Sequence, residues 1–366
     1  MQPASAFSIL RARHAAATLV LCFALLPPFG YALAQVASVP EVATYTGADR
    51  QQRLEAAAAK EGSLVIYTIG TQIEPLIDRF QTKYPYVKVS INRASAADTT
   101  RRVTEEYRAG AYYVDVFEQP TAGMIVPLSM GFLQAYMTPE ASAYNSAAIE
   151  KGHHWISVRE GYIGLGFNTE RIAPAEAPKT YEDLLDPKFR DRMAISGAAS
   201  TAAGWIGTMA ISKGDDFVRK LGAQDVRVYP ASGRAVANLM ISGEVALSPT
   251  IYSSHVEASK RQGAPLEWRA LGAVPVTDTS LALAAKAPHP NAAMLYIDFM
   301  LSREAQLMLR DLGYLSARAD MPPTEFTGLE KLYLANRPNY LAEFDHWMSL
   351  YQEVFLKGAA VPSVQE

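Results

Sequence analysis

In the first third of the chain, short apolar runs typical of strands alternate with segments whose apolar residues are spaced as in a helix. The apolar runs 64–68, 87–92 and 114–119 are short and predict strands. Between them, residues 74–84 and 99–108 carry apolar side chains at helical spacing, as Leu76, Ile77 and Phe80 illustrate. A further amphipathic segment before residue 62 predicts a first helix that ends at Gly62. Strands and helices in this order predict a parallel sheet with right-handed crossovers.

The second half of the chain continues in mixed α/β fashion. An apolar extended run at 162–167 contains two glycines, which favour close backbone approach over a helix. Further strands are predicted at 193–196, 226–229 and 245–250, and residues 266–287 contain two more extended runs. Helices are predicted near 202–212, 235–242, 291–301 and 303–312, with an amphipathic, aromatic-rich tail at 338–355.

The segment that follows the 162–167 run has a distinct layout. Pro174 and Pro178 favour extended backbone, and Thr180 then precedes a short helix with Asp183 three residues later, as in a capping box. Pro187 ends this helix before the 193–196 strand. Arg159 lies just before the extended run.

The first 34 residues have the pattern of a cleavable secretion signal. Arg11 and Arg13 precede an apolar stretch at 15–26, and the small-x-small triplet 32–34 would place cleavage after Ala34. The apolar stretch is shorter than the roughly 20 residues that a spanning helix needs. The single cysteine, Cys22, lies inside the signal, so we expect a mature chain without disulfides or thiolate ligands.

Composition narrows the class of protein further. Hydrophobic residues make up 49% and charged residues 19%, values typical of a chain that buries a full core. Loss of Arg11 and Arg13 from the 34 basic residues would leave 32 against 37 acidic ones, which gives no basic footprint for nucleic acid. At 366 residues the chain is long enough for two lobes of ordinary domain size.

Three segments resemble a known family: KTYEDLLDPKFRDRMAI, SGEVALSPTIY and APHPNAAMLYIDFMLS. They are similar to the bacterial extracellular solute-binding proteins that serve as receptors of ABC importers. The similarity is greatest to the ferric-iron-type branch, which also takes phosphorylated sugars, aminophosphonates, thiamine and other small solutes. It implies a periplasmic protein that closes on a small-molecule solute and docks on ABC permease subunits in the inner membrane; we expect a monomer.

The resemblance also implies an α/β type 2 periplasmic-binding fold of two lobes joined by crossing hinge strands. Each lobe is expected to have a central, mostly parallel sheet flanked by helices. After a signal at 1–34, we predict one lobe from residues 35–121 and 276–318, and the other from residues 122–275 and 319–366.

In open parallel sheets the ligand lies beyond the C-terminal strand ends, where helix N-termini converge. This rule, with the resemblance, selects hydroxyl and amide side chains at strand ends as contacts for a small anionic or polar solute, such as a phosphate ester, phosphonate or carboxylate. Ordinary helix caps, a surface arginine and a core tyrosine are the alternatives at these positions. The predicted ligand-binding residues are Thr68, Thr71, Ser95, Gln119, Arg159, Ser196, Ser200, Thr201, Ser232, Thr250 and Tyr252.

Ferric iron is the alternative solute. Ferric-binding members of the resembling family place two adjacent tyrosines after the strand that corresponds to 245–250, but here only Tyr252 is present. The adjacent pair Tyr112 and Tyr113 precedes another strand, and we interpret it as packing. We therefore expect no resident cofactor or metal, with Tyr252 as a ligand if Fe³⁺ is the solute.

An enzyme on the same two-lobed fold is the distant alternative. A thiamine-cleaving transferase, for example, needs a nucleophile that is usually cysteine, which the predicted mature chain lacks. No phosphate-gripping lysine loop, zinc-protease helix or nucleophile elbow occurs in the sequence. The sequence therefore favours a binding protein over an enzyme.

Overall fold

The computed structural model describes residues 38–70 and 73–356, with the side chains of residues 199 and 200 not described. The signal predicted at 1–34 and the contact predicted for Thr71 lie outside the described residues. Among the described residues, no helix has the length and apolar character needed to cross a membrane.

A first hydrophobic core forms around the parallel strands predicted from the N-terminal third. Strand β1 lies between β2 and β3, and it buries Leu64 and Ile66 completely. Gly62 ends the helix before β1 in the left-handed conformation, with φ of 67°. The elements here are α1 (Val39–Ala43), α2 (Arg50–Glu61), β1 (Ser63–Thr68), α3 (Glu74–Lys83), β2 (Lys88–Arg93), α4 (Ala96–Arg108), β3 (Val116–Pro120), η1 (Thr121–Met124), α5 (Ile125–Ser129), β4 (Leu133–Gln134), η2 (Pro139–Ala143), η3 (Ser146–Ala148), α10 (Pro290–Leu301) and α11 (Arg303–Asp311).

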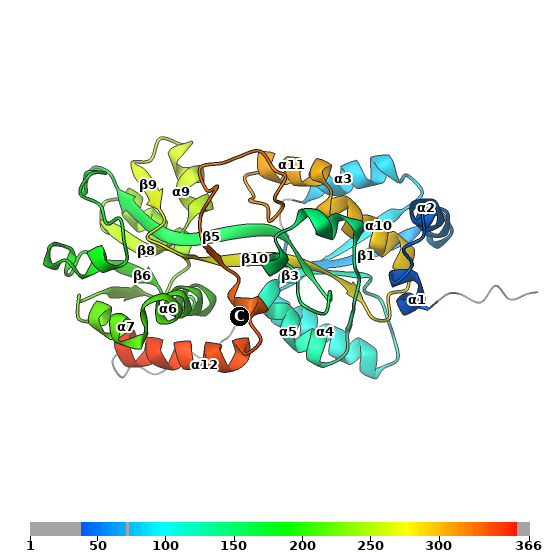
Figure 1. Ribbon diagram of the computed structural model, residues 1–366, viewed down its shortest axis with the longest axis horizontal. Coiled ribbons are helices and arrows are strands. Elements are labelled where there is room, and N and C mark those ends of the chain that lie inside the picture. Colours follow the sequence, from blue (N-terminus) through cyan, green and yellow to red (C-terminus); the bar gives the residue numbers. More distant parts are fainter. Residues whose placement is uncertain (1–37, 71–72, 357–366) are drawn as a thin grey trace, which may run out of the picture. The chain divides into compact units, whose positions relative to one another are not determined.

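Two long strands connect this core to a second one. β5 (Ile156–Asn168) and β10 (Val274–Ala284) pair in antiparallel register, with Thr279 opposite Arg159 and Asp278 opposite Glu160. Both strands contribute to the first core at one end and leave it toward the second, as Figure 1 shows. The register shifts between Thr279 and Ser280, which is a bulge in the middle of the pair.

The second core packs helices against the far end of β5, and a smaller hydrophobic cluster beside it is formed by residues between 194 and 266. The largest fully buried side chain of the second core is Trp205 of α6, a helix that is apolar on most of its faces. The elements are η4 (Glu182–Leu185), η5 (Pro187–Phe189), β6 (Ala194–Ser196), α6 (Ala199–Lys213), α7 (Asp215–Gly222), β7 (Arg227–Tyr229), α8 (Gly233–Ile241), β8 (Leu247–Tyr252), α9 (Ser253–Lys260) and β9 (Leu266–Arg269). β8 and β9 pair with β5 in antiparallel register, whereas β6 and β7 form a parallel pair.

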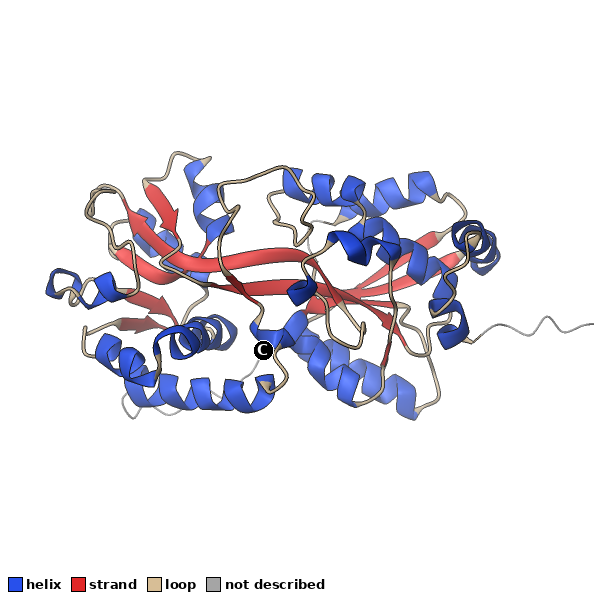
Figure 2. Ribbon diagram, viewed as in Figure 1, coloured by secondary structure: helices blue, strands red, loops and turns tan. Residues whose placement is uncertain are grey.

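The chain crosses between the cores a third time after α11. β11 (Lys331–Leu332) pairs with β10, and η6 (Leu334–Asn336) follows it. Helix α12 (Tyr340–Tyr351) and the π-helical turn at Gln352–Leu356 then pack on the second core, where Trp347 contacts α6. Figure 2 shows helices flanking the strands of both halves.

The predicted elements are present in the predicted type and order, but helices α5, α7 and α9 were not predicted, and two details differ. The crossover strand begins at Ile156, six residues earlier than predicted, so Arg159 lies within β5 and not before it. Thr180 and Asp183 form both bonds of a capping box, but the helix that they start is a single 3₁₀ turn.

The two cores suggest different lobe boundaries from those predicted. Residues such as Met124, Phe132 and Val158 pack in the first core, together with Tyr333, whereas Leu334 packs in the second. We propose that the first lobe extends to about residue 162 and resumes at about 274–333, with the rest of the described chain in the second lobe.

Candidate functional site

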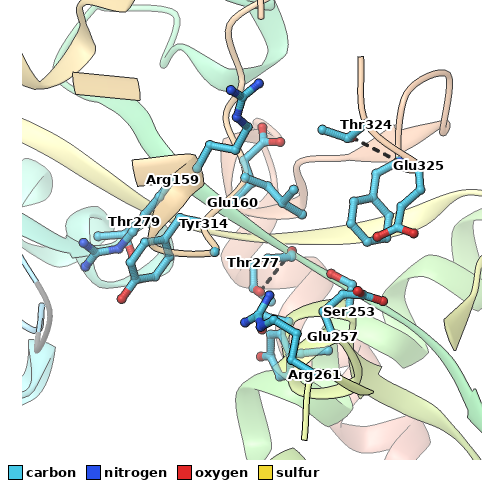
Figure 3. Close-up of a pocket in the computed structure, with 17 residues that line it drawn as sticks. Arg159, Glu160, Ser253, Glu257, Arg261, Thr277, Thr279, Tyr314, Thr324 and Glu325 are labelled. Atoms are coloured by element: carbon cyan, nitrogen blue, oxygen red, sulfur yellow. Dashed lines mark hydrogen bonds between the residues drawn. The ribbon is translucent and has the colours of Figure 1, made fainter. Parts of the chain in front are cut away.

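Two cavities lie where the hinge strands pass between the cores. The larger, about 350 Å³, has Arg159 and Gly161 of β5, residues of α9 such as Glu257, and Tyr314 in its lining (Figure 3). The smaller, about 250 Å³, has Thr121, Gly204 of α6 and Tyr340 in its lining. Tyr252, Thr277 and Thr279 line both cavities, so we treat the two as one cleft that meets at these residues.

Tyr252, the last residue of β8, lies at the centre of this cleft. A Cβ atom at Gly161 would lie 3.3 Å from its ring, and one at Gly233 would lie 3.4 Å from it, so both glycines let the backbone approach the ring closely. The hydroxyl of Tyr252 lies 3.4 Å from Oγ1 of Thr201 in α6. The structure therefore brings together the predicted residues Tyr252 and Thr201.

Arg159 lines the cleft, but its charge is already compensated. Its Nη1 lies 2.6 Å from Oε1 of Glu118, and the two side chains are only 7% and 0% exposed. The other carboxylate oxygen of Glu118 accepts a hydrogen bond from the Thr68 hydroxyl. Arg159 also stacks on Tyr314, with 5.1 Å between its Cζ and the ring centroid. Arg159, predicted as a ligand contact, therefore already has a carboxylate partner in Glu118.

Glu118 is a functional candidate that sequence reasoning missed. It lies inside β3, a strand in which its neighbours are buried. A single acidic residue within a run of buried residues indicates a special role, because an ionised carboxylate is buried only when it has a partner. Thr68, predicted as a direct ligand contact, instead donates to Glu118 and accepts a hydrogen bond from the Gly70 amide.

Helix α6 begins beside Tyr252 without a side-chain cap. Its N-cap residue is Ala198, in extended backbone, and no side chain there accepts a bond from the first turn. Before it, Ser196 donates from its hydroxyl to the Ala231 carbonyl and from its amide to Oγ1 of Thr250. Ser196 and Thr250 thus fix the turn that presents the first amides of α6, while the Ser200 side chain lies outside the described residues.

The other predicted positions serve local structure. Ser95 caps α4 and Ser232 caps α8, each by accepting a bond from a first-turn amide. Gln119 donates to the Tyr67 carbonyl and to the Thr99 hydroxyl, and it is 2% exposed. In the described part of the chain, Ser95, Gln119 and Ser232 line neither of the two cavities.

The larger cavity also has charged residues in its lining that the sequence did not single out. Glu160 accepts hydrogen bonds from Lys331, Tyr162 and Tyr333, so its charge is balanced. Arg261, Arg310 and Glu325 line the same cavity, and none of the three forms an ion pair with another described residue. Figure 3 shows Glu257 and Arg261 together, and Arg159 beside Tyr314 on another side.

The donor set of the cleft is poor in metal ligands. Over residues 38–70 and 73–356, no group of three histidine, cysteine, aspartate or glutamate side chains is placed to hold a metal ion. Tyr112 and Tyr113 are 39% and 55% exposed and line neither cavity. Tyr112 packs edge-on against Tyr107, whereas the packing role predicted for Tyr113 does not match its exposure.

Comparison with known proteins identifies the family. Residues 122–331 match the family model described as "Bacterial extracellular solute-binding protein". The chain belongs to this family. A relative from Haemophilus influenzae, described only as an uncharacterized protein, is 28% identical over 303 residues, which are 76% of this chain and 85% of that one.

Solved structures of similar fold include binding proteins with different ligands. Iron-bound HitA from Pseudomonas aeruginosa is 20% identical, with a TM-score of 0.64 over 80% of this chain and 99% of that one. AfuA from Actinobacillus pleuropneumoniae, with fructose-6-phosphate bound, is 24% identical, with a TM-score of 0.62 over 81% of this chain and 99% of that one. The FutA protein of Trichodesmium, in complex with iron and citrate, has a TM-score of 0.70 at 15% identity, over 80% of this chain and 99% of that one.

These findings confirm the two-lobed α/β fold and the family that the sequence predicted. This solute-binding protein is the periplasmic component of an ABC transporter, and it works with the membrane components of that transporter. The proteins that it resembles are transport binding proteins and not enzymes.

Proposed function

We propose that this solute-binding protein captures a small organic anion in the cleft between its lobes. The anionic group, a phosphate ester, phosphonate or carboxylate, lies at the N-terminus of α6, where it accepts hydrogen bonds from the first-turn amides. Thr201 and the Tyr252 hydroxyl contact the same group, and the protein carries the solute as a monomer.

The uncapped start of α6 is the observation that carries this proposal. Helices begin with free amides and a partial positive charge, which a side-chain cap or an anion satisfies. Ser95, Ser232 and Ser302 cap α4, α8 and α11, and Glu61 of α2 accepts bonds from the Asn291 and Ala292 amides of α10. α6, with Ala198 as its N-cap, has no such partner among the described side chains, and its Thr201 lies 3.4 Å from the Tyr252 hydroxyl. Helices α2, α3, α7, α9 and α12 also begin without a side-chain cap, so it is the contact with Tyr252 that selects α6 here.

Ferric iron is less well supported as the solute. Among the described tyrosines, only Tyr252 lines both cavities, and a hard cation prefers several anionic oxygen ligands. The compensating pairs of Glu118 with Arg159 and Glu160 with Lys331 leave those carboxylates engaged. The iron-bound neighbours and the sugar-phosphate-bound neighbour share the fold at low identity, so their ligands do not choose between these solutes.

The proposal is tested by giving α6 a cap of its own. Ala198 has the extended backbone of an N-cap, so Ala198→Asp should place a carboxylate on the amides that the solute would use. We expect calorimetry with fructose 6-phosphate, inorganic phosphate and citrate to show at least about a tenfold loss of affinity for whichever anion binds the wild-type protein. The melting temperature of the free protein should stay equal or rise, because the helix gains a cap.

Ala198→Asn is the matched control, because the amide also caps but carries no charge to repel the solute. Its loss of affinity should be smaller than that of the aspartate. Equal affinity of wild type and Ala198→Asp would show that the anion binds elsewhere. A ferric citrate titration that colours the wild-type protein would instead assign iron, and Tyr252→Phe would then remove the colour.

A further inference from the structure

The third crossing between the cores contains a short turn that is attached to both of them. Leu334, the first residue of η6, is 5% exposed and packs in the second core. Two residues later, Oδ1 of Asn336 accepts a hydrogen bond from Nε1 of Trp155 at 2.9 Å, and Nδ2 of Asn336 donates to the Ala147 carbonyl at 2.8 Å. Two residues of a 3₁₀ turn span only about 4 Å, so the turn cannot stay attached to both cores when the lobes move apart.

The two partners of Asn336 are parts of the first lobe. Trp155 is 5% exposed in the first core and directly precedes β5, and Ala147 lies in η3, next to the buried Ala148. The indole N–H can only donate and the carbonyl can only accept, so both ends of the Asn336 amide are matched to their partners. Asn336 is therefore tied to the first lobe by its bonds, whereas Leu334 is tied to the second lobe by its packing.

Residues of the two lobes also lie close together across the cleft in this arrangement. A Cβ atom at Gly313, which follows α11 of the first lobe, would lie 3.7 Å from Nη2 of Arg261 in the second lobe. Both residues line the larger cavity, and Thr121 and Tyr340 line the smaller one from opposite lobes. The turn at η6 is thus attached to both lobes in a form of the molecule in which they nearly meet.

We propose that η6 is a clasp between the lobes, which forms when they close and releases its Asn336 bonds when they separate. Leu334 stays in place, because burial of a leucine generally stabilises more than the net effect of a hydrogen bond that water can replace. Helix α12 moves with Leu334, since Trp347 packs against α6 of the second lobe. The clasp favours the closed form whatever the solute is, so this inference goes beyond the proposed function.

Two asparagines of the same segment test the clasp in the free protein. Asn336→Ala removes both bonds, and Asn339→Ala is the matched control, because Asn339 is exposed and its side chain makes no cap bond to α12. In small-angle X-ray scattering, Asn336→Ala should increase the radius of gyration by about 1 Å over the roughly 20 Å expected of a compact chain of this size. Asn339→Ala should leave it unchanged. A radius for Asn336→Ala that is equal to or smaller than that of the wild type would overturn the clasp.

Two indole N–H groups compare the clasp with a bond inside one lobe. Trp155 donates to Asn336 between the lobes, whereas Trp268 donates to the Ile251 carbonyl within the second lobe at 3.0 Å. In hydrogen exchange followed by NMR, the Trp155 indole should exchange at least about tenfold faster than that of Trp268, because separation of the lobes breaks only the first bond. Asn336→Ala should speed up Trp155 and leave Trp268 unchanged. Trp155→Phe assigns the signal by removing it, and it should enlarge the radius as Asn336→Ala does. Equal protection of both indoles in the wild type and in Asn336→Ala would contradict the clasp.

Solute binding gives a further measurement and separates the clasp from the proposed function. In calorimetry with fructose 6-phosphate, Asn336→Ala should bind about fivefold more weakly than the wild type, which corresponds to the loss of about one net hydrogen bond on closure. Weaker binding with an unchanged radius of the free protein would place Asn336 in the solute site and overturn the clasp. Failure of fructose 6-phosphate, inorganic phosphate and citrate to bind the wild type would overturn the proposed function, whereas the radius and the exchange of the free protein would still decide the clasp.

Discussion

At the scale of single residues, the buried charge of Arg159 at the cleft is paired with Glu118 before any solute binds. Arg159 and Glu118 come from different strands, β5 and β3, and both are almost fully buried. Neither Nη1 of Arg159 nor Oε1 of Glu118 makes a hydrogen bond of good geometry in the described chain, although they lie 2.6 Å apart. The pair thus fixes the arginine at the cleft and keeps the buried charge neutral overall.

Removal of Glu118 should therefore cost far more than removal of an exposed acidic partner. Glu118→Gln leaves Arg159 buried without its counter-charge, and we expect the free energy of unfolding to fall by about 3 kcal/mol. Glu304→Gln is the matched control, since Glu304 pairs with Arg79 at 2.5 Å but both side chains are at least 40% exposed. That change should cost less than about 1 kcal/mol.

Urea denaturation of the three proteins measures both values. Similar losses for the two variants would mean that Glu118 gives no more stability than an exposed partner, and that Arg159 finds another way to satisfy its charge. The variants remove the same group from the same kind of pair, so burial is the main difference between them.

The sequence predicted which residues lie at the cleft better than it predicted what each of them contacts. Thr201 could be selected because strand ends and helix starts meet at the cleft in a parallel sheet. Arg159 and Tyr252 were selected from the resemblance to the family. Glu118 lies inside a strand, where the sequence pattern only says that a side chain is buried. Its role depends on which strands become neighbours, and Thr279 pairs with Arg159 across 120 positions of sequence.

At the scale of elements, α6 serves binding at its start and packing along its length. Two of its glycines differ in what surrounds them, although both are buried in the same helix. A Cβ atom at Gly207 would lie 2.7 Å from the Trp347 ring of α12, whereas one at Gly204 would meet Ile163 and Pro275 at 3.6 and 3.7 Å. Gly207 therefore allows α12 to approach α6, and Gly204 leaves ordinary room.

Alanine at these two glycines should change stability in opposite directions. Gly207→Ala forces Trp347 away and should cost about 1–3 kcal/mol of unfolding free energy. Gly204→Ala should be neutral or gain up to about 1 kcal/mol, because alanine favours helix more than glycine does. Denaturant titration of both variants decides the matter, and a stabilised Gly207→Ala would show that α12 does not need this close approach.

Element type and order could be predicted from the sequence because the apolar periods of 2 and 3.6 residues are clear in this chain. The start of β5 could not, since residues 156–160 include Arg159 and Glu160, which interrupt the apolar run. These charges are tolerated in a buried strand only because Glu118 and Lys331 pair with them. Such pairing between distant strands is invisible to a local pattern.

At the scale of the whole molecule, β5 and β10 are two of the three segments that connect the cores, so closure of the lobes would have to bend or rotate them. β5 has 13 residues and so spans roughly 43 Å, enough to belong to both cores. Its pairing shifts register against β10 near Thr279 and against β8 near Gly164, and bulges of this kind bend strands. The cleft lies beside the first of these irregularities, since Thr279 lines both cavities.

A solute that contacts both lobes should shift the molecule toward a closed form, because only that form completes its contacts. On this view fructose 6-phosphate, or the better phosphate found by calorimetry, should lower the radius of gyration of the wild-type protein in small-angle X-ray scattering. Ala198→Asp should keep the radius of the free protein at the same concentration, because it lacks the anion contact in the second lobe. Tight binding with an unchanged radius would mean that one lobe alone recognises the solute, and the hinge would then have no part in capture.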